Sequence, residues 1–269
     1  MNSNLFMANS FDPVADIYDD TFSKTQIGKA QRDIVWKYLD KKKFVNKNIL
    51  EINCGTGEDA IFLSKNNNLT ATDASEEMLK ITNEKIKLNE IGTRCKTLLW
   101  DLNDPFPGDR DEKYDLIFSN FGGLNCLSSE TLKKLSAELF TLLRSGGKLI
   151  FVVMGRKCLW ESFYFLYKGK FKSVFRRRKS GVVKAPLNDK IFVDTYYHSP
   201  REFMRFFDEN FKLNKTLPVG FFIPPSYLDP FFTNKKRILN LFTRLDQMVF
   251  KVEILSNYAD HYLIELEMN

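Results

Sequence analysis

Glycine and acidic residues follow a short apolar segment near residue 50, in a spacing that suits a nucleotide-like ligand. Residues 49–60 read ILEINCGTGEDA, and Asp73 follows in the segment TDAS. An apolar strand, a turn with two glycines, a helix and an acid at the tip of the next strand hold a ribose-bearing ligand in doubly wound sheets. Gly55 and Gly57 suit such a turn because a side chain would keep the backbone away from the ligand.

The acids around this turn favour a ligand without phosphate groups. Residues 55–60 also match the G-x-G-x-x-G/A pattern of dinucleotide binding, so an NAD-dependent oxidoreductase is one alternative. However, Glu51 lies inside the strand, and Glu58 and Asp59 open the following helix. A helix N-terminus binds a pyrophosphate through its N–H groups and dipole, and acids there oppose that binding. S-adenosylmethionine (SAM) has a positive sulfonium, an amino group and no phosphate, so acids suit it better.

Residues 51–57, EINCGTG, resemble the E/D-x-G-x-G-x-G motif of class I SAM-dependent methyltransferases of the small-molecule type. Asn53 replaces the first glycine of the motif, a mild departure because asparagine tolerates left-handed backbone. The resemblance implies that Glu51 and the backbone of residues 53–57 hold the methionine part of SAM. It also implies that Asp73 accepts the ribose hydroxyls.

The segment before residue 20 resembles the F-D-x-x-A-x-x-Y-D pattern of the same family, since residues 11–19 read FDPVADIYD. In relatives this segment closes over the cofactor, so the resemblance implies an aromatic contact from Tyr18 to the sulfonium. It places Ala74, Asp101 and Leu102 beside the adenine. The expected cofactor-binding residues are Tyr18, Glu51, Asn53, Gly55, Gly57, Asp73, Ala74, Met78, Asp101, Leu102, Asn120 and Phe121.

The expected catalytic residues are Asn120, His198 and Tyr18. Methyl transfer from a sulfonium is an in-line displacement, so alignment and exclusion of water matter more than a strong base. Asn120 begins the segment NFGGLN at the tip of an expected strand, where the family has residues between cofactor and acceptor. The alternative is that this segment is only a turn. His198 is the candidate base for a hydroxyl acceptor, ahead of His261, because histidine titrates near neutrality.

The composition predicts a cytoplasmic α/β enzyme. The 269 residues are 43% hydrophobic, enough for a full core, and no apolar run is long enough to span a bilayer. The first residues, MNSNLF, do not resemble a signal peptide. The four cysteines form no C-x-x-C pair, so we expect free thiols and no metal site.

Alternating strand and helix patterns predict a Rossmann-like, doubly wound, seven-stranded sheet with its last strand antiparallel and a helical cap insertion. We expect one methyltransferase domain over residues 1–269. Its expected parts are N-terminal cap helices (1–45), a cofactor-binding core (46–155), a basic aromatic lid (156–198) and a C-terminal completion with a second cap segment (199–269). The expected helices cover residues 25–39, 59–65, 76–90, 130–143 and 200–210. The expected strands cover residues 49–53, 69–73, 95–100, 114–120, 148–154, 211–217 and 260–267.

Residues 156–190 concentrate the positive charge of the chain. They contain eleven lysines and arginines against two acids, a net charge of +9 in a chain whose total is +6. Large aromatic residues alternate with these charges. The segment could be a lid with inward aromatics, a contact to an anionic membrane surface or lipid, or an RNA-binding surface that uses residues 176–179, RRRK. Nucleic acid is the less favoured partner because no RNA-binding module surrounds it.

These observations predict SAM-dependent methyl transfer to a small, apolar or lipid-like acceptor. The alternatives from other classes are an RNA methyltransferase that uses the basic insertion, and a catalytically silent SAM-binding assembly factor. The presence of both Glu51 and Asp73 argues against the silent protein.

Overall fold

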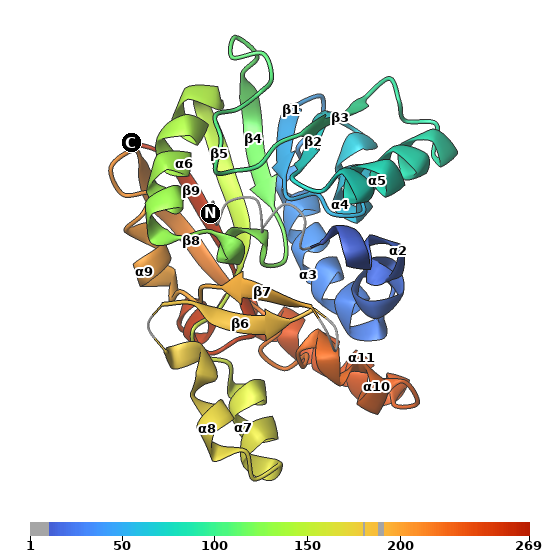
Figure 1. The fold of residues 1–269 in the computed structure, drawn as a ribbon, viewed down its shortest axis with the longest axis vertical. Helices are drawn as coiled ribbons and strands as arrows, with labels where there is room; N and C mark the ends of the chain where they lie inside the picture. The colour runs from blue at the N-terminus through green and yellow to red at the C-terminus, as the bar shows by residue number, and fades with distance from the viewer. Residues whose placement is uncertain (1–10, 180, 188–190) are drawn as a thin grey trace.

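A seven-stranded sheet with helices on both faces forms the centre of the computed structural model, which describes residues 11–179, 181–187 and 191–269 (Figure 1). The strand order is β3-β2-β1-β4-β5-β9-β8. The strands are β1 Asn48–Ile52, β2 Asn68–Asp73, β3 Cys95–Leu99, β4 Tyr114–Ser119, β5 Leu143–Met154, β8 Phe211–Val219 and β9 His261–Met268. Strands β1 to β5 are parallel, and β9 pairs antiparallel with both β5 and β8. The predicted sheet and its antiparallel last strand are therefore confirmed.

Alternating side chains of the strands supply two cores, one on each face of the sheet. Leu50 and Ile52 of β1 face one core, and Ile49 faces the other, as the period of two in a strand requires. The first face is covered by α6 (Ser129–Leu142) and α9 (Pro200–Met204), and the second by α3 (Gln26–Lys42), α4 (Glu58–Ser64) and α5 (Glu76–Leu88). Because β1 to β5 run parallel, their carboxyl ends lie at one edge of the sheet. The helices bury both faces, so this edge is where a site can form.

Helix α6 illustrates how the sequence fixes these boundaries. Ser128 accepts a hydrogen bond from the Thr131 N–H and caps the helix, and the leucines at helical spacing are buried. The helix expected over residues 200–210 is shorter in the structure, because α9 ends at Met204. The N–H groups of Phe206 and Phe207 then bond to carbonyls three residues earlier, as in a 3₁₀ turn. Strand β5 also begins at Leu143, five residues earlier than predicted.

Two caps cover the carboxyl edge of the sheet (Figure 1). The first, residues 11–23, contains α2 (Ala15–Tyr18). The second contains α7 (Leu159–Tyr167), α8 (Phe171–Val174) and an antiparallel hairpin of β6 (Val183–Pro186) and β7 (Phe192–Thr195). The helical cap insertion was predicted from the sequence, whereas this hairpin was not. Helices α10 (Asp229–Phe232) and α11 (Lys236–Val249) were also not predicted, and their apolar side chains pack against α3.

No helix among the described residues is long and apolar enough to cross a bilayer. The prediction about a signal peptide concerns residues outside the described ones.

Candidate active site

A cavity of about 390 Å³ lies at the carboxyl edge of the sheet, between the core and the two caps. Most of the predicted cofactor-binding residues line it: Tyr18, Asn53, Gly55, Asp73, Ala74, Met78, Asp101, Leu102, Asn120 and Phe121. Glu51, Gly57 and His198 do not line it. The strand tips and the N-terminal segment thus meet at one site.

The turn after β1 has the left-handed backbone that its sequence suggested. Asn53, Gly55 and Gly57 have φ angles of +59°, +54° and +82°. Asn53 accepts a conformation that most residues avoid, so its replacement of glycine leaves the turn intact. Gly57 does not line the cavity but faces α5. A Cβ added to Gly57 would lie 2.8 Å from the Thr82 side chain. Its glycine is needed for packing against α5.

Asp73 at the tip of β2 is oriented by backbone donors. Its two carboxylate oxygens accept the N–H groups of Gly55, at 2.8 Å, and Ser75, at 3.0 Å. These bonds tie the glycine turn to the second strand, and burial raises the pKa of the carboxyl. Asp73 also lines the cavity, and a carboxylate can accept more hydrogen bonds than these two.

Glu51 lies beneath the turn, fully buried in β1. No described group donates a hydrogen bond to its Oε2 atom. Burial, with nearby Asp59, raises its pKa well above the usual value. A buried carboxyl with an unsatisfied oxygen is costly, so this group points to a function other than packing.

The N-terminal segment is held over the cavity by two aspartates of the FDPVADIYD pattern. Asp12 accepts a hydrogen bond from the Ser75 hydroxyl. Asp19 accepts one from Thr56, at 2.6 Å, and forms an ion pair with Lys85 at 2.6 Å. Tyr18 lies between these anchors, and burial raises its pKa to about 12. It is therefore a neutral aromatic wall of the cavity at pH 7.

Arg32 on α3 lines the cavity and was not predicted from the sequence. Its side chain is buried, its Nε lies 3.4 Å from Asp59 Oδ2, and its guanidinium lies 5.3 Å from the centre of the Phe121 ring. It is the only lysine or arginine among the described lining residues. No sequence signal marks Arg32, because it precedes the glycine motif by about twenty residues in an ordinary amphipathic helix.

The tip of β4 is a strained turn held by Asn120. Phe121 has a φ of +48° and Gly122 of +83°. The Asn120 amide donates to Asp59 Oδ2 at 3.1 Å, and its oxygen accepts the Phe121 N–H at 3.1 Å. Asn120 thus fixes the turn that places Phe121 against the cavity.

The end of β5 and the β6–β7 hairpin supply an apolar part of the cavity lining. Met154 at the end of β5, Leu187 beside β6 and Val193 of β7 line this part. Tyr227, in the turn just before α10, also lines the cavity, and its hydroxyl donates to Glu161 Oε2 at 3.3 Å.

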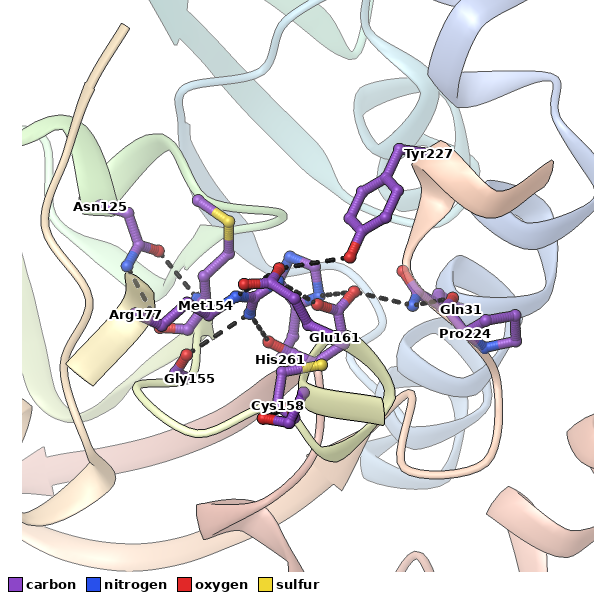
Figure 2. A network of polar contacts seen from close by, with 12 residues as sticks. Gln31, Asn125, Met154, Gly155, Cys158, Glu161, Arg177, Pro224, Tyr227 and His261 are labelled. Carbon is purple, nitrogen blue, oxygen red and sulfur yellow. Dashed lines mark hydrogen bonds and ion pairs between the residues drawn. The ribbon is translucent and has the colours of Figure 1, made fainter. Parts of the chain in front are cut away.

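A buried ionic network lies behind Tyr227 (Figure 2). Arg177 donates to Glu161 at 3.0 Å and to the Asp260 carboxylate at 2.7 Å, and Gln31 of α3 donates to Asp260 at 3.2 Å. These contacts join the basic insertion, the start of β9 and the first long helix. The arginine also holds the pKa of the Glu161 carboxyl below its usual value, against the effect of burial. Arg176 forms two further bonds to Glu161, so two arginines of the RRRK run face inward.

His198 occupies a different place from the predicted base. It packs against Phe206, with ring centres 5.1 Å apart, and burial lowers its pKa to about 4. It is not among the residues that line the cavity, a position that does not favour its assignment as a base. His261 pairs with Asp260 at 3.2 Å and lies behind Phe121. Within the described ranges, no group of histidines, cysteines and acids is arranged to hold a metal.

Comparison with known proteins agrees with this geometry. Residues 49–147 match the family model of a methyltransferase domain. This match covers well under half of the chain, and together with the sheet order and the strand-tip cavity it supports a class I SAM-dependent methyltransferase.

Individual relatives are distant. A malonyl-[acyl-carrier protein] O-methyltransferase of Bacillus cytotoxicus is 31% identical over 42% of this chain and 37% of its own length, so the chain spans well under half of that relative. A ubiquinone/menaquinone biosynthesis C-methyltransferase of Rickettsia bellii is 29% identical over 62% of this chain and 68% of its own. The structure titled "DhpI-SAH complex structure" has a TM-score of 0.63 at 14% identity, covering 99% of this chain and 97% of its own, and shows the shared fold.

Proposed function

We propose that this chain transfers a methyl group from SAM to a small, apolar or lipid-like acceptor. The observation that carries the proposal is the mixed lining of its cavity. The glycine turn, Asp73 and Tyr18 form one group of lining residues, and Met154, Leu187 and Val193 form an apolar group. A polar, ribose-bearing cofactor suits the first group, here called the cofactor side, and an apolar acceptor suits the second, here called the acceptor side.

The polar and charged groups of the cofactor side suit SAM. Bound SAM supplies an electrophilic methyl group on a sulfonium. Asp73 would accept the ribose hydroxyls, and the unsatisfied Glu51 oxygen beneath the turn would favour the cationic amino group nearby. Arg32 would attract the carboxylate. Ala74, Met78, Asp101 and Leu102 would surround the adenine, and the neutral Tyr18 ring would lie against the sulfonium.

The acceptor side favours a group that is already nucleophilic. No histidine is among the described residues that line the cavity, and Tyr18 holds its proton at pH 7. A carboxylate is already ionised at pH 7, and a quinol is more acidic than an alcohol, so both need less help from a base than an alcohol does. The names of two relatives describe methyl transfer to oxygen and to carbon, and both outcomes suit such an acceptor. Asn120 acts by holding the β4 turn, so catalysis would come from alignment and exclusion of water.

Two other functions are less well supported. Arg176 and Arg177 are engaged with Glu161, which removes half of the RRRK charge from an RNA-binding surface. A silent assembly factor would not need an acceptor wall beside the cofactor site.

The four-part division of the domain and a cytoplasmic location also belong to this proposal.

A methyl-transfer assay with labelled SAM tests the proposal. The acceptors are a dicarboxylic acyl thioester, a quinol and a simple alcohol of matched apolar length. We expect label in the acyl thioester or the quinol, and none in the alcohol. Tight SAM binding without label in any apolar acceptor would favour the assembly factor, and label in RNA would contradict the apolar acceptor.

A further inference from the structure

We propose that the tip of the α7–α8 hairpin, residues 166–172, docks this protein on an anionic lipid surface. The proposal deepens the lipid-like acceptor of the preceding section and rests on it for its purpose. The hairpin extends away from the sheet, beyond the β6–β7 hairpin (Figure 1). Its sequence there is LYKGKFK.

Every residue of this tip is exposed. Tyr167 is 87% exposed and Phe171 is 67% exposed, which is unusual for aromatic side chains of a folded domain. Lys168, Lys170 and Lys172 alternate with them. Large apolar groups beside lysines are the composition that binds the interface of a membrane, where the rings enter the headgroup region and the ammonium groups meet lipid phosphates.

The charge of the tip is not neutralised by the protein. Glu161 is the only acid between residues 156 and 179, and it is buried and paired with Arg176 and Arg177. Lys170 and Lys172 have no ion-pair partner among the described residues, and Lys168 lies over the Tyr164 ring, 6.0 Å from its centre. The tip therefore presents three positive charges without a compensating acid in the described part of the hairpin.

The shape of the tip favours a membrane over a macromolecule with a defined surface. A stable protein partner requires a broad, complementary contact. Here the exposed residues lie at the end of a narrow projection (Figure 1). Two of the four basic residues that a nucleic acid would use, Arg176 and Arg177, face inward and bind Glu161. A fluid anionic surface needs neither a groove nor a fixed pattern of donors.

The hairpin is connected to the acceptor wall of the cavity. Glu161 of α7 accepts hydrogen bonds from Arg177 and from Tyr227, and Tyr227 lines the cavity (Figure 2). Arg177 in turn holds Asp260 at the start of β9. A tip anchored on a bilayer would therefore hold the acceptor side of the cavity in a fixed position near that bilayer, where an apolar acceptor is dissolved.

Vesicle cosedimentation tests this docking. The wild type is mixed with vesicles of phosphatidylcholine containing phosphatidylglycerol, and with vesicles of phosphatidylcholine alone. We expect binding to the first that weakens as salt is added, because the attraction is screened. Lys168→Gln/Lys170→Gln/Lys172→Gln should weaken it by at least about tenfold, since each lysine near an anionic surface contributes roughly fivefold. Tyr167→Ser/Phe171→Ser should weaken it at every salt concentration.

A matched control removes three exposed lysines from α3, as Lys29→Gln/Lys37→Gln/Lys41→Gln. This variant has the same net charge as the tip variant and should bind vesicles almost as the wild type does. Equal binding by the tip variant and the wild type, or no binding of the wild type to anionic vesicles, would overturn the proposal. SAM titration of each variant separates the docking proposal from the proposed function. If the tip variant binds SAM but not vesicles, the effect is located at the tip. If the wild type binds vesicles but not SAM, only the proposed function is contradicted.

Discussion

A Cβ atom added to Gly123 would lie 2.5 Å from both Cβ and Cγ of Asn53. Asn53, which replaces a motif glycine after β1, therefore fills the space that is left because residue 123, after β4, is a glycine. The two strand tips are complementary at this contact, and each residue limits what the other can be.

Gly123→Ala should consequently destabilise the protein by about 1–3 kcal/mol through overpacking. Asn53→Gly in the same chain should restore most of the loss, because it removes the atoms that the new methyl group meets. Urea unfolding of the two single variants and the double variant measures this coupling. Gly92→Ala is the control, since its added Cβ would have only Ile86 Cγ2 within contact, at 4.0 Å. Additive effects of the two substitutions would contradict the contact.

Arg32→Gln should weaken SAM binding by roughly tenfold to a hundredfold, the effect of losing a charged hydrogen bond. Methylthioadenosine, which lacks the carboxylate and amino group of SAM, should bind the variant and the wild type equally. Calorimetry with both ligands makes the second ligand an internal check of folding. A similar loss for both ligands would show that Arg32 supports the cavity in another way.

His198 should affect stability rather than the reaction. Burial lowers its folded pKa to about 4, below the unfolded value of about 6.5. Between these pH values the unfolded chain binds the extra proton, so the free energy of unfolding falls as the pH is lowered, by up to ~3 kcal/mol. His198→Phe should remove this dependence and leave the pH profile of kcat unchanged. A variant that folds but loses turnover would restore His198 to the mechanism.

Asp246 of α11 holds residues 221–223 in place through three backbone donors. Its carboxylate accepts the N–H groups of Phe221, Phe222 and Ile223 at 3.0, 2.9 and 2.9 Å. Asp246→Asn replaces one acceptor oxygen with a donor and should cost about 1–3 kcal/mol in urea unfolding. Asp229 accepts a single N–H, from Ile27, so Asp229→Asn can keep its bond and should be almost neutral. Equal effects of the two variants would contradict this role.

The fold was predictable because its signals are local. Apolar strands, the glycine turn and the cap at Ser128 act over a few residues, and the structure has each of them close to the expected position. The lid was less predictable because its structure depends on long-range pairing. The charges of Arg176 and Arg177 suggested a solvated surface. In the structure Arg177 is buried, because it pairs with Glu161 on the same lid and with Asp260 about eighty residues away. Arg32 was not predicted for the same reason, and His198 was predicted as a base although it packs against Phe206. Residue type shows what a side chain can do, and the tertiary fold decides what it faces.

The most direct test of the account is a calorimetric titration of SAM into the wild type, Asp73→Ala and a control, Asp33→Ala, which changes an exposed aspartate on α3. We predict micromolar binding by the wild type and the control. Asp73→Ala should bind at least about a hundredfold more weakly, because the ribose loses its charged acceptor. A folded wild type that binds no SAM, or an Asp73→Ala variant that binds as tightly as the control, would contradict the assignment of this cavity to the cofactor.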